Sequence, residues 1–454
     1  MAFLIEDSVP AMHAESQLFS VPISYTERYR TEHERLNPTT VISEDGTTGD
    51  INFFIPPSSN GLLDLSSVTL ELELAIKVKK PDSEWTFLSD ANDLACPGNN
   101  ILHSLFQAVH LTVGNRLISD AGCNYGYRAY MESLLHCTRG NAESVLSNAG
   151  YKIDTPGAMN LLDTNEGAKW RRMLFSRGQF VQLSGKLACD LFQQDKALLT
   201  GVPVGIRLVT ARKEFYLQSW DQTANKEFKV VIRNPKIAIR RYIPAPDYMI
   251  KITEELQRKT VKYAVERTIM RTTDISKGVQ NTIVSNLHIG ALPKVVLLGF
   301  VASDDFCGKL GRNPFNFQNY EISQISVEVD GTSYSTKPYV TDFKKHHYLE
   351  AYDGLLNTLG QRHTPNGQVQ FDREAYGNGY TLFGFDLTPG ATGRGPMTLI
   401  KQGTLSVAVS FASPLHEVVM MVAMLVYDNL IEVSSTNTPL PHIPTLINDT
   451  SFAD

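Results

Sequence analysis

Alternating apolar and polar residues recur along most of the chain and predict a protein built mainly from β-strands. Between residues 69 and 79 an apolar side chain occupies nearly every second position. A period of two is typical of a strand buried on one face, whereas a helix would spread these residues around its circumference. Residues 109–113 alternate in the same way. The turn Gly114-Asn115 and the apolar residues at 117–118 then predict a hairpin.

Further strands are predicted on both sides of one short helix. Pro244 and Pro246 should end a sheet, and a helix is expected at 247–259, where apolar and polar residues recur at helical spacing. The other predicted strands span 179–187, 202–210, 228–233, 236–243, 262–272, 294–300, 322–329, 380–387, 404–411 and 417–427. Many short strands separated by turn residues favour sandwiches or barrels over alternating βαβ units.

Two parts of the chain resemble each other. Each contains an alternating strand, a two-residue turn, an Ala-Tyr pair and a Leu-Leu pair, in that order. These features are Gly114-Asn115, Ala129-Tyr130 and Leu134-Leu135 in the first part, and Asp330-Gly331, Ala351-Tyr352 and Leu355-Leu356 in the second. The segments 187–191 and 383–387 form another pair, and each precedes an alternating strand. Chance similarity among β-rich segments is the alternative. We favour two copies of one β unit.

Two copies of this length predict an all-β fold, a double jelly roll of two tandem eight-stranded antiparallel β-sandwiches with a short linking helix. Immunoglobulin-like domains of about 100 residues would need four repeats. The expected limits are an N-terminal arm at 1–45, a first jelly roll at 46–245, a linker helix at 246–261, a second jelly roll at 262–433 and a C-terminal tail at 434–454. The arm has eight acidic and three basic residues, so it should not neutralise phosphates.

Composition restricts the function further. Apolar residues make up 42% and charged residues 20% of the 454-residue chain, which is typical of a globular protein. A net charge of -6 argues against a protein that mainly coats nucleic acid. No apolar run approaches about 18 residues, so no membrane span is expected, and the N-terminus does not resemble a signal peptide.

The five cysteines predict reduced thiols in a cell interior rather than disulfides. They are widely spaced and form no CxxC pair: Cys96, Cys123, Cys137, Cys189 and Cys307. Zinc binding would require paired ligand spacing, so no metal or cofactor is expected. Asn448-Asp449-Thr450 matches the glycosylation pattern, but without a secretory signal it should remain unmodified.

No residue set predicts a catalytic, cofactor-binding or metal site. The glycines before Lys186 and Lys309 lack P-loop spacing, and neither GxSxG nor HExxH occurs. Asp304-Asp305 is expected in a turn, since adjacent residues of a strand point to opposite faces. His346-His347 follows two lysines and is expected in a solvated basic patch. Cys137 follows His136, but sequence adjacency is not nucleophile–base geometry.

Three basic pairs are the remaining candidates for a binding surface. They are Arg171-Arg172, which follows Trp170, Arg240-Arg241 and Arg258-Lys259. We expect them on solvated faces or at subunit contacts. Contact with nucleic acid is a less favoured alternative.

Several segments, in their order along the chain, carry a family resemblance. They are 102–107, 127–135, 201–208, 292–294, 313–317 and 377–383, the last followed by 385–389. Together they resemble the major capsid protein (hexon) of Polinton or Maverick elements and the related adintoviruses. The resemblance extends from about residue 17 to residue 432. No single motif is diagnostic, and the order of the segments makes the match specific.

The resemblance implies a double jelly roll, a homotrimeric capsomer and a place in a virion capsid made inside the host cell. Six lobes from three chains would form a pseudo-hexagonal block that tiles an icosahedral shell. Neighbouring capsomers and a vertex (penton) capsid protein would be its partners.

Three alternative functions remain. A single-jelly-roll vertex protein is disfavoured by the repeat, and a two-domain β-sandwich carbohydrate-binding protein or glycosidase lacks a convincing site. A domesticated host copy is not distinguished from an active capsid gene.

Overall fold

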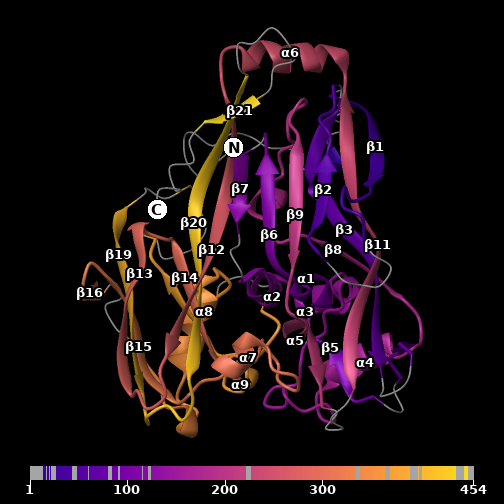
Figure 1. Ribbon diagram of the computed structural model, residues 1–454. Helices are drawn as coiled ribbons and strands as arrows, with labels where there is room; N and C mark the ends of the chain where they lie inside the picture. Colours follow the sequence, from indigo (N-terminus) through magenta and orange to yellow (C-terminus); the bar gives the residue numbers. More distant parts are fainter. Residues whose placement is uncertain are drawn as a thin grey trace.

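The computed structural model describes most of the chain. The described residues are 14–16, 18–19, 21, 27–42, 49–59, 61–79, 84–89, 93–114, 116–120, 124–220, 226–333, 338–362, 369–388, 397, 401–435 and 444–447. They form two antiparallel β-barrels that stand side by side with their strands in a common direction (Figure 1).

The first barrel consists of two antiparallel sheets whose apolar faces meet. Sheet A has the order β1-β11-β3 and continues through β8, which pairs with β3; sheet B has the order β2-β9-β6-β7. The strands of sheet A are β1 (Arg28–Leu36), β11 (Glu227–Pro244), β3 (Leu62–Lys79) and β8 (Val181–Lys186). Those of sheet B are β2 (Ile51–Ile55), β9 (Val204–Thr210), β6 (Phe106–Val113) and β7 (Arg116–Asp120).

The second barrel repeats this arrangement. Sheet C has the order β12-β20-β14-β18 and sheet D the order β13-β19-β15, with β16 and β17 both paired to β15. The strands of sheet C are β12 (Val261–Ile275), β20 (Val419–Ser435), β14 (Val295–Ala302) and β18 (Leu382–Asp386). Those of sheet D are β13 (Asn281–Ala291), β19 (Gln402–Phe411), β15 (Ile322–Val329), β16 (Thr332–Ser333) and β17 (Tyr339–Val340).

The strands of the two barrels correspond one to one in chain order, with β16 and β17 together in the place of β7. The β6–β7 hairpin matches the β15–β16 hairpin, and β9 and β19 occupy the same place beside them. The sequence repeat is therefore a structural repeat, and the predicted double jelly roll is confirmed. Four short strands complete the sheets. β4 (Thr86–Phe87) pairs with β3, β21 (Pro444–Ile447) pairs with β20, and β5 (Ala95–Pro97) and β10 (Leu217–Ser219) form a separate two-stranded sheet.

Helices fill the connections between strands. They are α1 (Ile101–Ser104), α2 (Tyr125–His136), α3 (Arg139–Glu143), α4 (Glu166–Phe175), α5 (Lys213–Tyr216), α6 (Pro246–Leu256), α7 (Ser303–Cys307), α8 (Leu349–Thr358) and α9 (Arg373–Tyr376). Short 3₁₀ helices cover Ala14–Ser16, Leu146–Ala149, Asp190–Gln193 and Phe343–Lys345. The predicted linker helix is α6, which joins the barrels at one end of the molecule and has no buried residue (Figure 1).

Several segments differ from the sequence expectations. β1 lies inside the range 1–45 that was expected to be an arm, and β20 and β21 extend into the tail range 434–454. β1 was missed because its residues are mostly charged; only Leu36 packs against the first core. The predicted strands 228–233 and 236–243 are one strand, β11, with a bulge between Arg233 and Lys236.

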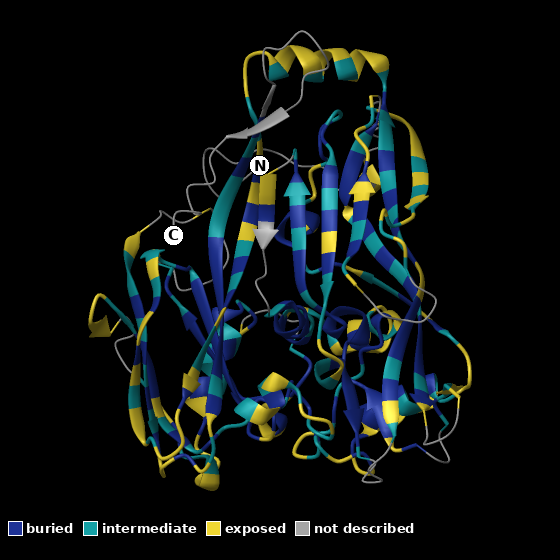
Figure 2. Cartoon of the chain, viewed as in Figure 1, coloured by how far each residue is buried: buried dark blue, intermediate teal, exposed yellow. Residues whose placement is uncertain are grey.

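Each barrel has its own apolar core, but each core also uses residues from the other half of the chain. Tyr263, Val265, Ile431 and Val433 of sheet C pack into the first core. In return, five side chains of α2 belong to the second core: Tyr127, Tyr130, Met131, Leu134 and Leu135. The helix lies buried between the barrels near the centre of the molecule (Figure 2). The two halves are thus interlocked.

Candidate assembly surfaces and the polar centre between the barrels

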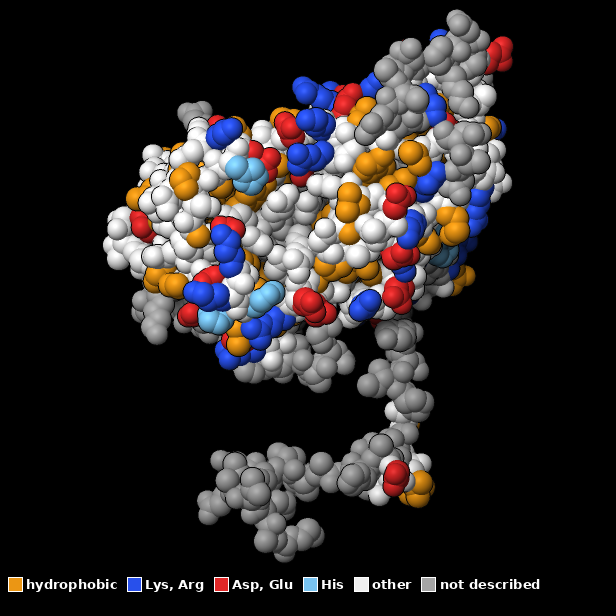
Figure 3. Space-filling view, turned by 90° about the horizontal axis from the view of Figure 1, so that it is seen from below, with side chains coloured by type: hydrophobic (Ala, Val, Ile, Leu, Met, Phe, Trp, Pro, Cys, Tyr) orange, Lys and Arg blue, Asp and Glu red, His pale blue; other side chains and the backbone are white. Residues whose placement is uncertain are grey.

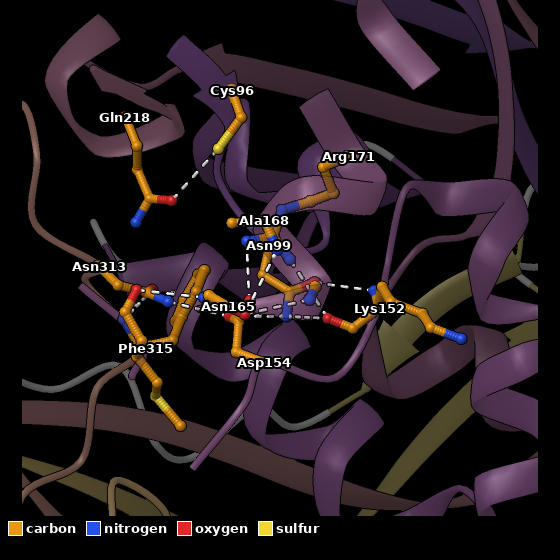
Figure 4. A network of polar contacts seen from close by, with 12 residues as sticks. Cys96, Asn99, Lys152, Asp154, Asn165, Ala168, Arg171, Gln218, Asn313 and Phe315 are labelled. Atoms are coloured by element: carbon orange, nitrogen blue, oxygen red, sulfur yellow. Dashed lines mark hydrogen bonds and ion pairs between the residues drawn. The ribbon is translucent and has the colours of Figure 1, made fainter. Parts of the chain in front are cut away.

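A fully buried ion pair between Arg171 and Asp154 lies at the junction between the barrels. We call this pair and its hydrogen-bond partners the polar centre. Arg171 of α4 donates from Nη2 to Asp154 Oδ1 over 2.9 Å, and both side chains are 0% exposed (Figure 4). Arg171 also donates to the carbonyls of Pro97 and Lys152, over 3.0 and 3.2 Å. Burial disfavours the charged guanidinium, but Asp154 and other nearby groups together raise the pKa of Arg171.

Two asparagines extend this pair into a network that reaches the second barrel. Asn99 donates to Asp154 Oδ2 over 3.2 Å, and Asn313, from the connection between β14 and β15, donates to the same atom over 2.9 Å (Figure 4). The Tyr380 hydroxyl donates to the Asp154 carbonyl over 2.6 Å. Asp154 therefore receives hydrogen bonds from both barrels at once. A satisfied buried network of this kind fixes one relative placement of the two halves.

A second buried pair joins α2 to sheet C. Arg128, 1% exposed, binds Glu132 over 2.8 Å and also pairs with Asp190. The Thr268 backbone N–H of β12 donates to the Asp190 carboxylate over 3.3 Å. Burial raises the pKa of Asp190, and Arg128 opposes that shift. We assign these contacts a structural role, because Arg128 and its two acidic partners pair with one another in the protein interior.

Aromatic side chains complete the junction. Tyr130 of α2 stacks on Phe315 with ring centroids 4.2 Å apart, and the Tyr127 hydroxyl donates to the Pro314 carbonyl over 2.8 Å. Beside this cluster lies a cavity of about 560 Å³ that is lined by residues of both α2 and sheet C. Its lining is mostly apolar and includes Ala129, Leu146, Leu297 and Met424.

The structure separates the two adjacent acids. Asp304 and Asp305 lie on α7 rather than in the expected turn. Asp304 is exposed and pairs with Lys309 over 3.0 Å, whereas Asp305 is fully buried with Arg312 Nη1 at 3.2 Å. Burial raises the pKa of Asp305 to about 6, with Arg312 opposing the shift. The two carboxylates do not converge on one substrate position.

The expectation for the basic pairs is wrong for Arg171 and Arg241, which are both buried. Arg171 belongs to the polar centre, and Arg241 pairs with Glu34 of β1 over 3.1 Å. Sequence alone gave no sign of this, because no local motif links Arg171 to Asp154, 17 residues away, or Arg241 to Glu34, 207 residues away. By contrast, Arg258 and Lys259 are exposed, and Lys259 pairs with Glu255 over 3.1 Å.

His346 and His347 are exposed beside Lys344 and Lys345, as expected for a solvated basic patch. The lysines pair with Glu321 and Asp342, over 2.9 and 3.0 Å. Within the described ranges, no group of three or more His, Cys, Asp or Glu side chains is arranged to hold a metal ion. No helix in the same ranges is long and apolar enough to cross a membrane.

The described cysteines are all free. Burial raises the pKa of Cys96 and of Cys189 to about 12, so both remain thiols. Burial also raises the pKa of Cys137, the neighbour of His136. Cys307 is exposed. Cys123 and the Asn448-Asp449-Thr450 sequence lie outside the described residues.

The end of the molecule opposite α6 carries basic and acidic side chains interspersed with apolar ones (Figure 3). Leu161 and Leu310 are exposed apolar residues, at 56% and 43% exposure. Trp220 lies between their segments and donates from Nε1 to the Asn160 carbonyl over 2.8 Å. This end therefore presents a mixed surface rather than a field of one sign.

The sequence reasoning missed Asp154, Asn99 and Asn313 entirely. Asp154 and Asn313 are 159 residues apart, and neither belongs to a recognisable motif. The only available sign was indirect: Asn313 opens one of the segments that carry the family resemblance.

With four sheets paired in this way, the chain is a double jelly-roll protein. Solved structures with the same fold are viral capsid proteins. A chain of the Sputnik virophage matches with a TM-score of 0.60 and 10% identity, over 95% of this chain and 92% of that chain. The mavirus major capsid protein matches with a TM-score of 0.55 and 11% identity, over 95% of both chains. For the Faustovirus major capsid protein the TM-score is 0.54 and the identity 7%, over 91% of this chain and 92% of that one. At these identities the likeness establishes the fold.

Comparison by sequence adds one relative. The uncharacterized protein F54H12.2 of Caenorhabditis elegans is 26% identical over 328 residues, which cover 69% of this chain and 74% of that protein. No family model matches the chain.

Proposed function

We propose that this chain is a structural major capsid protein and not an enzyme. The observation that carries the proposal is the double jelly roll itself. The same fold occurs in the major capsid proteins of mavirus and Faustovirus over more than nine tenths of each chain. The buried charges of the chain support a mechanical role, since the polar centre locks two barrels together and leaves Asp154 and Arg171 inaccessible to a substrate.

In this proposal three chains form a homotrimer whose six barrels give a pseudo-hexagonal capsomer. Capsomers tile an icosahedral shell, with neighbouring capsomers and a vertex (penton) capsid protein as partners. Obligate interfaces of such blocks bury about 2,000–5,000 Å². Weaker contacts between capsomers add up over many copies. The protein would then be located in the virion capsid.

The affiliation with Polinton or Maverick elements and adintoviruses is also a proposal, supported by the ordered sequence segments. One of them, 313–317, supplies Asn313 and Phe315 to the junction between the barrels. We further propose that the residues preceding β1 contact neighbouring capsomers. Removing residues 1–26 should leave soluble trimers that assemble poorly, and normal shells from that variant would contradict the idea.

The alternative of a two-domain β-sandwich carbohydrate-binding protein or glycosidase is not favoured. A glycosidase needs two carboxyl groups on either side of one bond, about 5–9.5 Å apart and facing each other. The acids considered for this role diverge, with Asp304 exposed and Asp305 buried beside Arg312.

Light scattering of the purified chain, with negative-stain images of the same fraction, tests the proposed function. We expect a particle of three times the 50.5 kDa chain mass, with a pseudo-hexagonal outline or closed shells. A stable monomer that never assembles at any concentration would refute the capsid proposal.

A further inference from the structure

One helix-to-sheet contact made by the first barrel has no equivalent in the second barrel among the described residues. α2 follows the β6–β7 hairpin of the first barrel and is covered by sheet C of the second barrel. Its counterpart α8 follows the β15–β16 hairpin of the second barrel. In the described part of the chain no third barrel follows to cover α8.

The burial of the two helices differs accordingly. In α2, nine of the twelve residues are buried, including Tyr130 and Leu135 at 0% exposure. In α8, three of the ten residues are buried, and Tyr352, the counterpart of Tyr130 in the repeat, is only partly buried. Leu349 at the start of α8 is 54% exposed, and Val340 of the adjacent β17 is 63% exposed. Large apolar side chains are thus uncovered where the repeat places an interface.

The face that would correspond to the outer face of sheet C belongs to sheet A. Leu70, Leu72 and Leu74 of β3 point into the first core, so the residues between them form the outer face of sheet A. Strand pairing places more basic than acidic residues on this face. The basic ones include Arg35, Lys77, Lys79, Lys229, Arg233 and Lys236, and the acidic ones include Glu71, Glu73 and Glu227. The exposed side of α8 carries Glu350, and its charge complements that basic excess.

We propose that α8 and β17 of one chain bind the outer face of sheet A of a second copy, head to tail. This contact between two chains would be equivalent to the packing of α2 against sheet C within one chain. A head-to-tail (heterologous) contact gives a closed ring when the rotation that relates neighbouring subunits is a whole fraction of 360°. In the proposed capsomer, six barrels from three chains would close the ring. The inference rests on the proposed capsomer and assigns its interface.

The test compares three matched variants by light scattering. Leu349→Lys with Val340→Lys places charges on the proposed interface. Ile283→Lys with Ile289→Lys does the same on the outer face of sheet D, where the two residues are 60% and 67% exposed. Ile250→Lys on α6, 58% exposed, is the control. All five sites are exposed, so each variant should fold, which circular dichroism and thermal unfolding verify.

We expect only the first variant to dissociate the trimer, with its dissociation constant raised about 100-fold or more. A photoreactive benzoylphenylalanine at position 349 should cross-link to peptides of β1, β3 or β11 from another chain. A trimer that survives the first variant, dissociates with the sheet D variant, or cross-links elsewhere would overturn the inference while leaving the capsid proposal intact. A wild-type chain that never trimerises would overturn both.

Discussion

Replacing Asp305 with asparagine should stabilise the protein at neutral pH and change little in acid. The Asp305 carboxyl group is 0% exposed, and neither oxygen accepts a hydrogen bond from the described residues. Arg312 Nη1 lies 3.2 Å from Oδ1, close enough for an ion pair but not aligned for a hydrogen bond. A buried carboxylate in this position is costly, whereas the neutral form is tolerated.

The sign and size follow from the pKa. Burial raises the pKa of Asp305 from 3.8 to about 6, although Arg312 opposes the shift. Because the folded value is the higher one, this group contributes stability that is fully present below about pH 4. That stability is lost as the pH rises through about 6. A difference of about 2 between the folded and unfolded pKa corresponds to about 3 kcal/mol in the free energy of unfolding. Asparagine cannot ionise, so its advantage should approach that value at pH 7.5, because the pKa of about 6 already includes the attraction to Arg312.

Urea unfolding at pH 4 and pH 7.5, at equal protein concentration, measures this difference. Asp304→Asn on the same helix is the matched control, because Asp304 is exposed and its substitution should have a small effect at both pH values. An Asp305→Asn protein that is less stable than wild type at pH 7.5, or whose advantage is the same at both pH values, would refute the reasoning.

Three further predictions concern other parts of the molecule. Arg171→Met should lower the free energy of unfolding by about 3–5 kcal/mol, since Asp154 would remain buried without its counter-charge; urea titration measures this, and an unchanged midpoint would contradict it. Removing residues 1–40 should reduce the soluble yield far more than removing 1–26, because only the longer deletion takes away β1 and the Glu34 partner of Arg241; equal yields would argue against it. Thiol labelling followed by mass spectrometry should modify Cys307 quickly and Cys96 and Cys189 only after unfolding; similar rates at all three would show that the buried thiols are accessible.

The sequence predicted those strands that alternate cleanly, because one face of each is buried. β3, β6 and β19 are of this kind, with Leu70, Val109 and Val407 at 0% exposure. β14 was also found, although all eight of its residues are buried and it reads as a continuous apolar run. β1 and β13 were missed because neither alternates cleanly: the residues of β1 are mostly charged. β13 exposes Ile283 and Ile289, which obscures its alternation.

The helices and the polar centre were not predictable in the same way. α2 is buried on nearly all sides, so it lacks the polar face that marks an amphipathic helix. The more exposed helix α6 was predicted, because one of its faces is apolar and the other is polar. Asp154, Arg171 and Asn313 meet only because the two barrels are packed together, so no local spacing reveals them.

The interlocked cores have a consequence for the order in which the chain folds during synthesis. Ile431 and Val433 belong to the core of the first barrel but are synthesised only after nearly all of the second barrel. The N-terminal half can form its sheets early, yet part of its apolar interior stays open until the whole second barrel has been translated. The nascent first barrel therefore exposes an aggregation-prone surface while the second barrel is being translated. We expect the nascent chain to stop needing chaperones once β20 has been synthesised.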